Sequence, residues 1–359
     1  MHQRSQFWKK AVVISFAYEW IAPTRRVATT AVVALFSVTS PAATRESEAL
    51  SDPVAWYASY QRDARLVQLP GGRVLNLYCV GAGSPTVVLE SGIGGDAYDW
   101  RAVQDKVAKL TRVCAYDRAG LGRSSPGPLP RDTKAEVSDL EALLGAAHLR
   151  GPYVLVGHSM GGYNVRLFAS RHPNDIAGIV LVDPSVENQI PVMEAAAPAI
   201  AENDRKSLAF VRACADPQPS AEVVARCARS APKSFPPDLA ASYVAAHGPA
   251  FFQTFQSEVE SFLTLDSREV AAERRQLGST PFIVLTRGER SSDIPADQAA
   301  VEWNLWNQMH NDLAKLSTVG VNRVVQGANH YIQLDKPDAV VDAVEEVVTT
   351  TRQRRTGHN

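Results

Sequence analysis

The sequence predicts an α/β fold built on a mostly parallel sheet, and three observations support this prediction. First, short apolar runs alternate with segments of helical periodicity from about residue 65 onward, which is typical of parallel strands joined by crossover helices. Second, two alternating runs flank the turn Pro70-Gly71-Gly72, as in an N-terminal β-hairpin. Third, the alternation stops between Pro184 and about Ser279 and then resumes, which indicates a helical cap inserted after the sixth strand.

Each predicted element rests on its local pattern. Strands are expected where a short run is apolar or alternates and ends at a turn signal, and helices where apolar residues recur three or four positions apart. The expected strands are 65–69, 73–80, 86–90, 113–116, 153–156, 177–182, 281–286 and 323–325. Outside the cap, in which we predict helices and no strand, the expected helices are 100–110, 133–147, 159–171, 297–316 and 337–350.

The composition is that of a globular protein. With 359 residues, the chain is long enough for one large α/β domain that carries an insertion. Hydrophobic residues make up 45% and charged residues 21%, which sets aside the disordered, collagenous and coiled-coil classes. The 37 Lys and Arg nearly balance the 38 Asp and Glu, so the chain lacks the basic excess with which proteins bind nucleic acid. No nucleic-acid partner is expected.

The first 45 residues differ in character from the rest of the chain. An apolar stretch at 27–38 follows Arg25 and Arg26 and precedes small residues at positions 40, 42 and 43, which is typical of a secretory signal peptide. We therefore expect export, to the periplasm or as a secreted protein; the alternative is a leader that anchors the protein at a membrane. The chain would then divide into a leader at 1–45, a core at 46–184 and 280–359, and a helical cap at 185–279.

The four cysteines match no zinc pattern and no CxxC motif, so we expect neither a metal site nor a redox site from them. Cys214 and Cys227 share one polar segment, where a local disulfide is plausible in an oxidising compartment. Cys79 and Cys114 lie inside predicted strands. A reduced cysteine there acts as a small buried hydrophobe, and we expect both to be core residues.

The clearest chemical signal is the sequence GHSMGG at 157–162. It follows a predicted buried strand and precedes a predicted helix. A serine hydroxyl is a weak nucleophile at neutral pH, and a tight strand-to-helix turn would hold the Oγ of Ser159 above the sheet, while the glycines on either side prevent collisions. The helix N-terminus adds positive partial charge. Because strand, motif and helix coincide, we expect Ser159 to be a catalytic nucleophile.

With this motif the chain resembles the α/β-hydrolase superfamily over roughly 65–350. The sequence YDRAGLGRS at 116–124 looks like the turn after the fourth strand of that fold, and Ser91-Gly92-Ile93 stands where many members carry His-Gly-X. The resemblance implies an α/β-hydrolase fold and an oxyanion hole formed by the backbone N–H groups of Ile93 and Met160. A serine at the turn argues against the dehalogenase and epoxide-hydrolase branches, which use an aspartate there.

The superfamily order of nucleophile, acid and histidine guides the search for the base. Among the histidines well beyond Ser159, His247 falls in the cap, His310 in a predicted helix and His358 in the tail. His330 lies in a loop between the last strand and a helix, so we expect it to be the base.

Three residues are candidates for the acid of the triad. In the commoner family arrangement it follows the seventh strand, three residues after a glycine, but that place holds Ser291 here. Some members place the acid after the sixth strand, which Asp183 closes, and Asp183 is our first choice. Asp293 and Glu289 are the alternatives.

Two further features lie around the loop after the third strand. The sequence GIGGDA at 92–97 matches the pattern GxGxxA of dinucleotide sites, but two strands precede it, and a dinucleotide site would leave Ser159 and His330 unexplained. Glu90, at the end of the strand, would be a costly buried carboxylate unless it is paired, and Arg118 is the expected partner.

The sequence thus predicts a serine hydrolase that cleaves an ester-like acyl bond of a small-molecule substrate. In this reading Ser159 attacks, His330 transfers the proton and Asp183 orients the imidazole. No metal and no organic cofactor is required. Acyl transfer or peptide cleavage uses the same residues, and a ligand-binding module without turnover is the alternative from another functional class.

Overall fold

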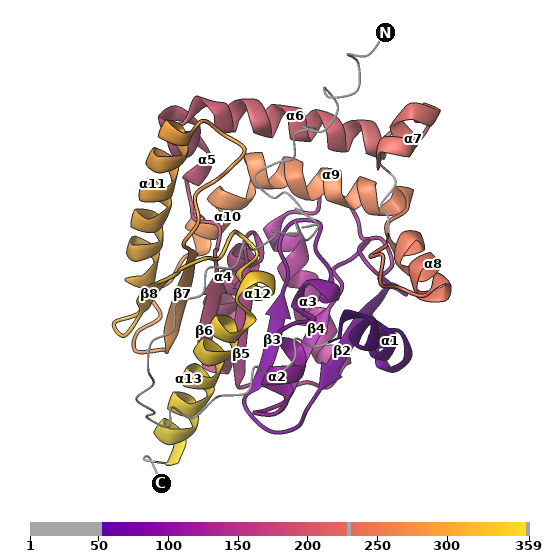
Figure 1. Ribbon diagram of the computed structural model, residues 1–359. Helices are drawn as coiled ribbons and strands as arrows, with labels where there is room; N and C mark the ends of the chain where they lie inside the picture. The colour runs from indigo at the N-terminus through magenta and orange to yellow at the C-terminus, as the bar shows by residue number, and fades with distance from the viewer. Residues whose placement is uncertain (1–51, 228–230, 357–359) are drawn as a thin grey trace, which may run out of the picture.

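The computed structural model describes residues 52–227 and 231–356, and this part of the chain is organised around one eight-stranded sheet (Figure 1). The strand order is β1-β2-β4-β3-β5-β6-β7-β8. β2 pairs antiparallel with both β1 and β4, and the other neighbours are parallel. The predicted fold class is confirmed. The strands are β1 Arg65–Gln68, β2 Val74–Val80, β3 Thr86–Glu90, β4 Val113–Tyr116, β5 Tyr153–His158, β6 Ile176–Val182, β7 Phe282–Arg287 and β8 Val321–Val325.

Helices cover both faces of the sheet. One face packs against α1 Pro53–Asp63, the 3₁₀ helix η1 Ala97–Trp100, α2 Gln104–Ala108, α12 Ile332–Asp335 and α13 Pro337–Thr356. The other face packs against α3 Thr133–Ala146, α4 Gly161–Arg171 and α11 Ala296–Ala314. A second 3₁₀ turn, η2 Pro173–Asp175, leads from α4 into β6.

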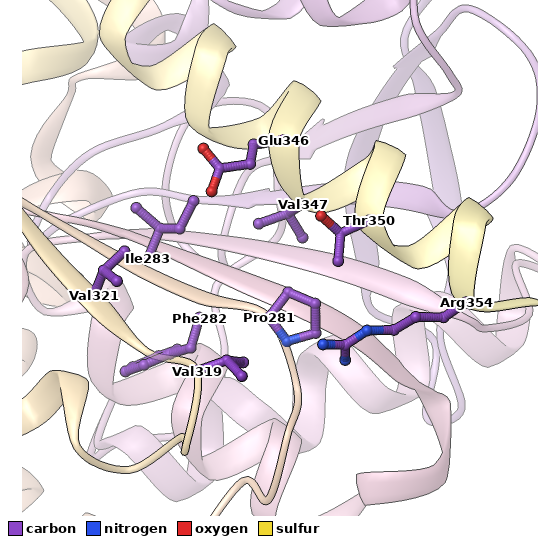
Figure 2. A pocket seen from close by; sticks show the side chains of 9 residues that line it. All are labelled: Pro281, Phe282, Ile283, Val319, Val321, Glu346, Val347, Thr350 and Arg354. Carbon is purple, nitrogen blue, oxygen red and sulfur yellow. The ribbon is translucent and has the colours of Figure 1, made fainter.

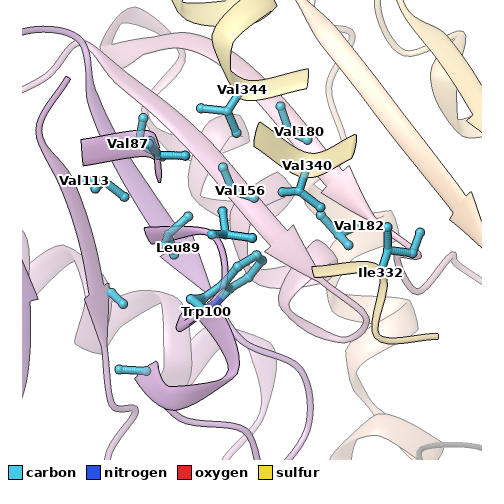
Figure 3. Close-up of a cluster of buried hydrophobic side chains, with 14 of the residues drawn as sticks. Val87, Leu89, Trp100, Val113, Val156, Val180, Val182, Ile332, Val340 and Val344 are labelled. Atoms are coloured by element: carbon cyan, nitrogen blue, oxygen red, sulfur yellow. The ribbon is translucent and has the colours of Figure 1, made fainter. Parts of the chain in front are cut away.

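The central strands are buried on both faces because successive side chains point to opposite sides of a strand. In β5, Val154 and Val156 enter the cluster beneath α13, whereas Leu155 enters the cluster beneath α3 and α4. Figure 3 shows the first cluster, where Val156 lies among side chains of β3, β6 and α13. A strand that is buried on both faces must be apolar throughout, which explains why short apolar runs predicted strands correctly.

A helical cap separates β6 from β7. Within the described residues it consists of α5 Gln189–Ala196, α6 Pro198–Ala215, α7 Ala221–Cys227, α8 Pro237–Ala246, α9 Pro249–Thr264 and α10 Asp266–Glu273. In Figure 1, α6 and α9 lie next to each other across one end of the sheet. As predicted, the described part of this segment contains helices and no strand.

The helix α1 precedes the first element that we predicted. Asp52 caps it by accepting the N–H of Val54 at 2.9 Å, and Pro53 occupies its start, where a missing N–H costs nothing. Its aromatic side chains Trp56 and Tyr60 are buried against the sheet. The helix therefore closes the β1–β2 side of the core.

Both cysteine pairs form disulfides. The bond Cys214–Cys227 joins the end of α6 to the end of α7, in line with the expected local disulfide. The expectation of a reduced Cys79 and Cys114 was wrong. These residues are direct partners in the antiparallel pairing of β2 and β4, with their Cα atoms 4.0 Å apart. Reading each strand alone could not show that the two strands are neighbours.

The predicted signal peptide lies outside the described residues, so export and membrane association stay predictions. Over residues 52–227 and 231–356, no helix is both long and apolar enough to cross a membrane.

Candidate active site

The turn between β5 and α4 carries Ser159 in a strained conformation. Its φ is 54°, in the left-handed region that non-glycine residues rarely adopt. Its N–H donates to the carbonyl of Val182 at 3.1 Å, and its carbonyl accepts the N–H groups of Gly162 and Ser185, both at 2.9 Å. Ser159 is buried, and its Oγ has no hydrogen-bond partner among the described residues. Backbone hydrogen bonds to β6, to the residues after it and to α4 thus fix the turn, whereas the Ser159 hydroxyl is not used in holding it.

The glycines of the motif are required by close backbone contacts. A Cβ at Gly157 would lie 2.6 Å from the carbonyl oxygen of Gly161, and a Cβ at Gly161 would lie 2.6 Å from the carbonyl oxygen of Ser91. Real Cβ atoms do not approach other atoms so closely. The sharp turn therefore exists only with glycine on each side of the serine, as the motif predicts.

His330 and Asp183 meet at the same edge of the sheet. Ser159, Asp183 and His330 follow the carboxyl ends of β5, β6 and β8. The Nδ1 of His330 donates to Oδ2 of Asp183 at 2.7 Å. Of the three candidate acids, Asp183 is the one for which this contact to the histidine is seen. Asp183 also has a left-handed φ of 41°, directly after its strand.

The carboxylate of Asp183 is held by donors on all sides. Its Oδ1 accepts the N–H of Arg287 at 3.0 Å and the indole N–H of Trp306 at 2.8 Å, and its Oδ2 accepts the guanidinium of Arg287 at 2.9 Å. Burial by itself would raise the pKa of Asp183, but Arg287 and His330 outweigh burial and hold that pKa far below its ordinary value. The carboxylate is therefore ionised at any working pH.

The two alternative acids lie elsewhere on the surface. Asp293 is exposed, and its carboxylate accepts the side-chain amide of Asn203 on α6 at 3.4 Å. Glu289 is exposed too, and its N–H donates to the carbonyl of Ala328 at 3.0 Å. Ser291, which stands at the commoner acid position, donates its hydroxyl to Glu302 at 3.2 Å.

The loop after β3 lies against the serine. A Cβ added to Gly92 would be 3.1 Å from the Cβ of Ser159, so the Gly92–Ile93 peptide is adjacent to that side chain. Ile93 and Met160, the predicted oxyanion donors, are both buried in one apolar cluster. The two residues thus lie on the two backbone segments that border Ser159.

Arg118 is the buried centre of an ion-pair network behind this loop. Its Nη1 donates to Oε1 of Glu90 at 3.0 Å, which confirms the expected pairing. It also donates to the carbonyl oxygens of Ser91 at 2.7 Å and Gly92 at 2.6 Å. Burial disfavours the Arg118 charge, but Glu258, Glu90 and Glu136 outweigh burial and raise the pKa of Arg118 well above its ordinary value.

Comparison with known proteins identifies the family. The model of the alpha/beta hydrolase family matches residues 87–343, which is most of the chain. The chain belongs to the alpha/beta hydrolase family. Among curated relatives, the uncharacterized protein YqjL of Bacillus subtilis (strain 168) is 26% identical over 267 residues, which cover 74% of this chain and 85% of YqjL.

Solved structures of other alpha/beta hydrolases share the fold. A thermophilic esterase from Thermogutta terrifontis matches with a TM-score of 0.53 and 21% identity, over 80% of this chain and 98% of the esterase. A putative lipase from Acinetobacter baumannii AYE matches with a TM-score of 0.60 and 17% identity, over 85% of this chain and 96% of the lipase. At these identities the likeness shows the fold alone.

Several residues around the candidate site were not found from the sequence. Arg287, which ends β7, and Glu258, in the cap, carry no motif. Trp306 and His310 stand one helical turn apart on α11, and His310 Nε2 contacts the carbonyl of Pro184 at 2.8 Å, next to Asp183. Residues four positions apart lie on one face of a helix, so the sequence could have indicated that Trp306 and His310 face the same part of the structure.

His158 supports the loop that carries His330. Its Nε2 donates to the carbonyl of His330 at 3.0 Å, and the two rings lie 4.6 Å apart between centroids. Burial, followed by the proximity of His330, lowers the pKa of His158 well below its ordinary value, so the ring is neutral. His158 therefore fixes the position of the histidine backbone without adding charge.

The space around the glycine-rich loop after β3 is filled by protein atoms. A Cβ at Gly94 would lie 2.8 Å from the ring of Phe255, and a Cβ at Gly95 would lie 2.2 Å from the carboxylate of Asp99. In dinucleotide sites an acidic residue about 20 positions beyond the glycine-rich motif binds the ribose, and Asp117 stands at that place here. Asp117 accepts the Ala97 N–H at 3.0 Å and three other protein donors. These contacts leave no support for the dinucleotide alternative.

One surface hollow lies far from Ser159. Figure 2 shows it between the beginnings of β7 and β8 and the last turns of α13. Phe282 and Val321 border it, whereas the candidate site lies at the opposite, carboxyl ends of the strands. This hollow is therefore separate from the candidate site.

Proposed function

We propose that this protein is a serine hydrolase that cleaves an ester-like acyl bond through an acyl-enzyme on Ser159. The observation that carries the proposal is the His330–Asp183 hydrogen bond, which lies at the same carboxyl edge of the sheet as the strained, buried Ser159. A histidine held by an ionised carboxylate is the arrangement that activates a serine hydroxyl in hydrolases of several folds.

The first half of the proposed reaction forms the acyl-enzyme. The Oγ of Ser159 attacks the substrate carbonyl carbon while Nε2 of His330 accepts the hydroxyl proton. The carbonyl oxygen becomes an oxyanion, which the N–H groups of Ile93 and Met160 stabilise. The tetrahedral intermediate then collapses, the ester C–O bond breaks, and the leaving alkoxide takes the proton from His330 and departs as the alcohol.

The second half returns the free enzyme. Water attacks the acyl carbon as His330 accepts one of its protons, and the new tetrahedral intermediate expels Ser159 Oγ, which recovers the proton. Asp183 keeps its charge throughout, because its pKa lies far below the working range. Its task is to orient the ring through Nδ1 and to stabilise the imidazolium.

The surroundings of the site favour an apolar small-molecule substrate. Ile93, Met160 and Tyr163 of the core pack in one apolar cluster with Val259 and Phe262 of α9. Apolar side chains of this kind typically line the acyl or alcohol side of a ligand pocket. We therefore propose esters with apolar acyl chains as the substrate class.

The test is hydrolysis of a series of p-nitrophenyl esters of increasing acyl length by the full chain and its variants. We expect Ser159→Ala to lower kcat by at least about 10⁴-fold and Asp183→Asn by about 10³- to 10⁴-fold, because each disables the triad. Ser138→Ala, on the exposed face of α3, and Asp293→Asn are the matched controls, and both should retain parental kcat.

The outcomes separate the alternatives. Loss in Ser159→Ala alone would move the acid to Asp293 or Glu289. Product esters formed when a second alcohol is added would indicate acyl transfer. A parent protein that neither turns over any ester nor reacts with a fluorophosphonate at Ser159 would contradict the proposal and favour a binding module.

A further inference from the structure

The polar backbone groups next to the proposed oxyanion donor Ile93 are each fixed by a specific partner. The carbonyl oxygen of Gly92 accepts Nη2 of Arg118 at 2.6 Å and the N–H of Gly95 at 3.0 Å. The N–H of Gly94 donates to Oε2 of Glu258 at 2.7 Å. The peptides on both sides of Ile93 are thus held by charged side chains.

Holding the Gly92 carbonyl sets the direction of the Ile93 N–H. In a planar trans peptide, the C=O of one residue and the N–H of the next point in opposite directions. Arg118 binds the carbonyl on the side of the buried network, so the N–H points away from that network. The Ile93 N–H stabilises an oxyanion only if it points at that oxygen. A small rotation of the Gly92–Ile93 peptide would turn this N–H away.

Arg118 is in turn held by a carboxylate from the cap. Its Nε donates to Oε1 of Glu258 at 3.0 Å and its Nη2 to Oε2 at 3.2 Å. Glu258 belongs to α9, and the side chains of both residues are at most 1% exposed. Such a pair is stabilised only by close contacts of this kind, because each charge would be costly to bury alone.

We propose that Glu258 is a positioning residue through which the cap sets the geometry of the oxyanion hole. Both of its oxygens accept hydrogen bonds from Arg118, and Oε2 also accepts the N–H of Gly94; together these bonds hold the Gly92–Ile93 peptide against Ser159. The cap would then take part in catalysis itself, beyond covering the substrate. This inference rests on the proposed function, because an oxyanion hole matters only if an oxyanion forms.

Helix α9 also provides a matched control. Glu260 lies two residues further along, where it pairs with Arg212 at 2.8 Å and accepts the Gln256 amide at 3.0 Å on the outer side of the cap. Glu258→Gln and Glu260→Gln make the same chemical change on one helix. Glu258→Asp serves as a second variant that keeps the buried charge but shortens the side chain, should Glu258→Gln fail to fold.

The experiment measures kcat, KM and inhibitor affinity on a p-nitrophenyl ester with the full chain. The inhibitors are an aryl trifluoromethyl ketone, which adds to a serine and forms an oxyanion, and the matching methyl ketone, which binds without that adduct. We expect Glu258→Gln to lower kcat about 10- to 100-fold with KM within about threefold, which is less than the 10²- to 10³-fold loss on deleting an oxyanion donor. Affinity for the trifluoromethyl ketone should fall by a similar factor, and affinity for the methyl ketone should not.

Four results would overturn the inference. One is a Glu258→Gln variant with the kcat and trifluoromethyl ketone affinity of Glu260→Gln. Another is an equal loss of affinity for both ketones, which would mean a collapsed pocket. The third is a Glu258→Asp variant that folds, as judged by its Tm, and keeps full kcat. The fourth, a parent protein without turnover or fluorophosphonate labelling, overturns the proposed function as well, whereas the first three leave it intact.

Discussion

At the scale of single residues, the carboxylate of Asp183 links His330 to a buried arginine. Its Oδ2 accepts Nδ1 of His330 at 2.7 Å and the guanidinium of Arg287 at 2.9 Å. Glu302 of α11 forms a second ion pair with Arg287, so the guanidinium is held between two carboxylates. Arg287 therefore fixes the position of the carboxylate that contacts the imidazole.

Removing that cation should therefore slow the reaction. In the double variant Arg287→Gln with Glu302→Gln, in which no carboxylate loses its only partner, we expect kcat on a p-nitrophenyl ester to fall by about 10- to 100-fold. The reason is that the Asp183 carboxylate loses the guanidinium that holds its Oδ2 and can move from the position in which it contacts His330. Steady-state kinetics of the variant and the parent measure the loss.

The control for this experiment is Arg290→Gln. Arg290 is an exposed arginine in the loop that follows β7, so its loss should leave kcat at the parental value. A parental kcat in the double variant would show that Arg287 does not position Asp183.

The site could be predicted from the sequence where a residue carries a local signature. Ser159 stands in a motif between a strand and a helix, and His330 and Asp183 each follow a predicted strand. Arg287 and Glu258 have no such signature, because their role arises from contacts that are distant along the chain. Arg287 contacts Asp183, which is 104 positions away, and Glu258 contacts Arg118, which is 140 positions away. Local periodicity contains no information on which buried charge meets which.

At the scale of elements, too, features with a local sequence pattern were predicted, whereas features that lack a clear local pattern or depend on distant contacts were missed. Strands such as β3 and β5 were found because burial on both faces makes their sequences continuously apolar. Helix α1 was missed although Asp52-Pro53 is a capping signal, because its buried aromatic side chains do not form a strong apolar stripe. The Cys79–Cys114 bond was missed because it depends on which strands pair.

The disulfide between α6 and α7 should stabilise the cap locally. Cys214 and Cys227 are 13 residues apart and belong to a buried cluster with Leu121 of the core and Phe251 of α9. Closing a loop of about 15 residues contributes about 3 kcal/mol in the chain-entropy model. We expect the double variant Cys214→Ser with Cys227→Ser to be cleaved faster by a protease within residues 198–227, as mass spectrometry of the fragments would show.

The core serves as the internal control for this variant. Its β2–β4 disulfide is intact, so fragments from the sheet should appear at the parental rate. Equal cleavage rates of variant and parent within the cap would contradict a stabilising role for the bond.

At the scale of the whole molecule, the buried charges make stability depend on pH. Burial raises the pKa of Asp266 to about 7, and nearby Glu269 and Asp132 add to the shift. The folded protein then binds a proton that the unfolded chain, with an ordinary aspartate pKa near 4, has already released. The free energy of unfolding therefore falls as pH rises from about 4 through 7.

Asp266→Asn should remove this dependence at its site. The amide oxygen can still accept the N–H of Thr133, the bond by which α10 of the cap contacts the start of α3 at 2.9 Å. We expect the variant to be more stable than the parent, with an advantage that grows by on the order of 2 kcal/mol between pH 5 and pH 8. Urea denaturation at several pH values measures the difference.

The comparison between variant and parent is needed because other groups act in the opposite direction. Burial lowers the pKa of His310 to about 4, so the neutral ring stabilises the fold above the ordinary histidine pKa and loses that contribution as pH falls. Both proteins contain this histidine, and its contribution cancels in the difference. A pH-independent difference would show that Asp266 does not titrate in this range.

The position of Glu258 on α9 has a consequence for protein engineering. The cap is inserted between β6 and β7. An insertion of this kind can be replaced by the cap of another alpha/beta hydrolase in order to change substrate preference. A transplanted cap without a carboxylate at this point would leave Arg118 facing two acidic residues of its own core and Gly94 without its acceptor. Chimeras of this fold should therefore be designed with the graft and Arg118 treated as one unit, exchanged or retained together.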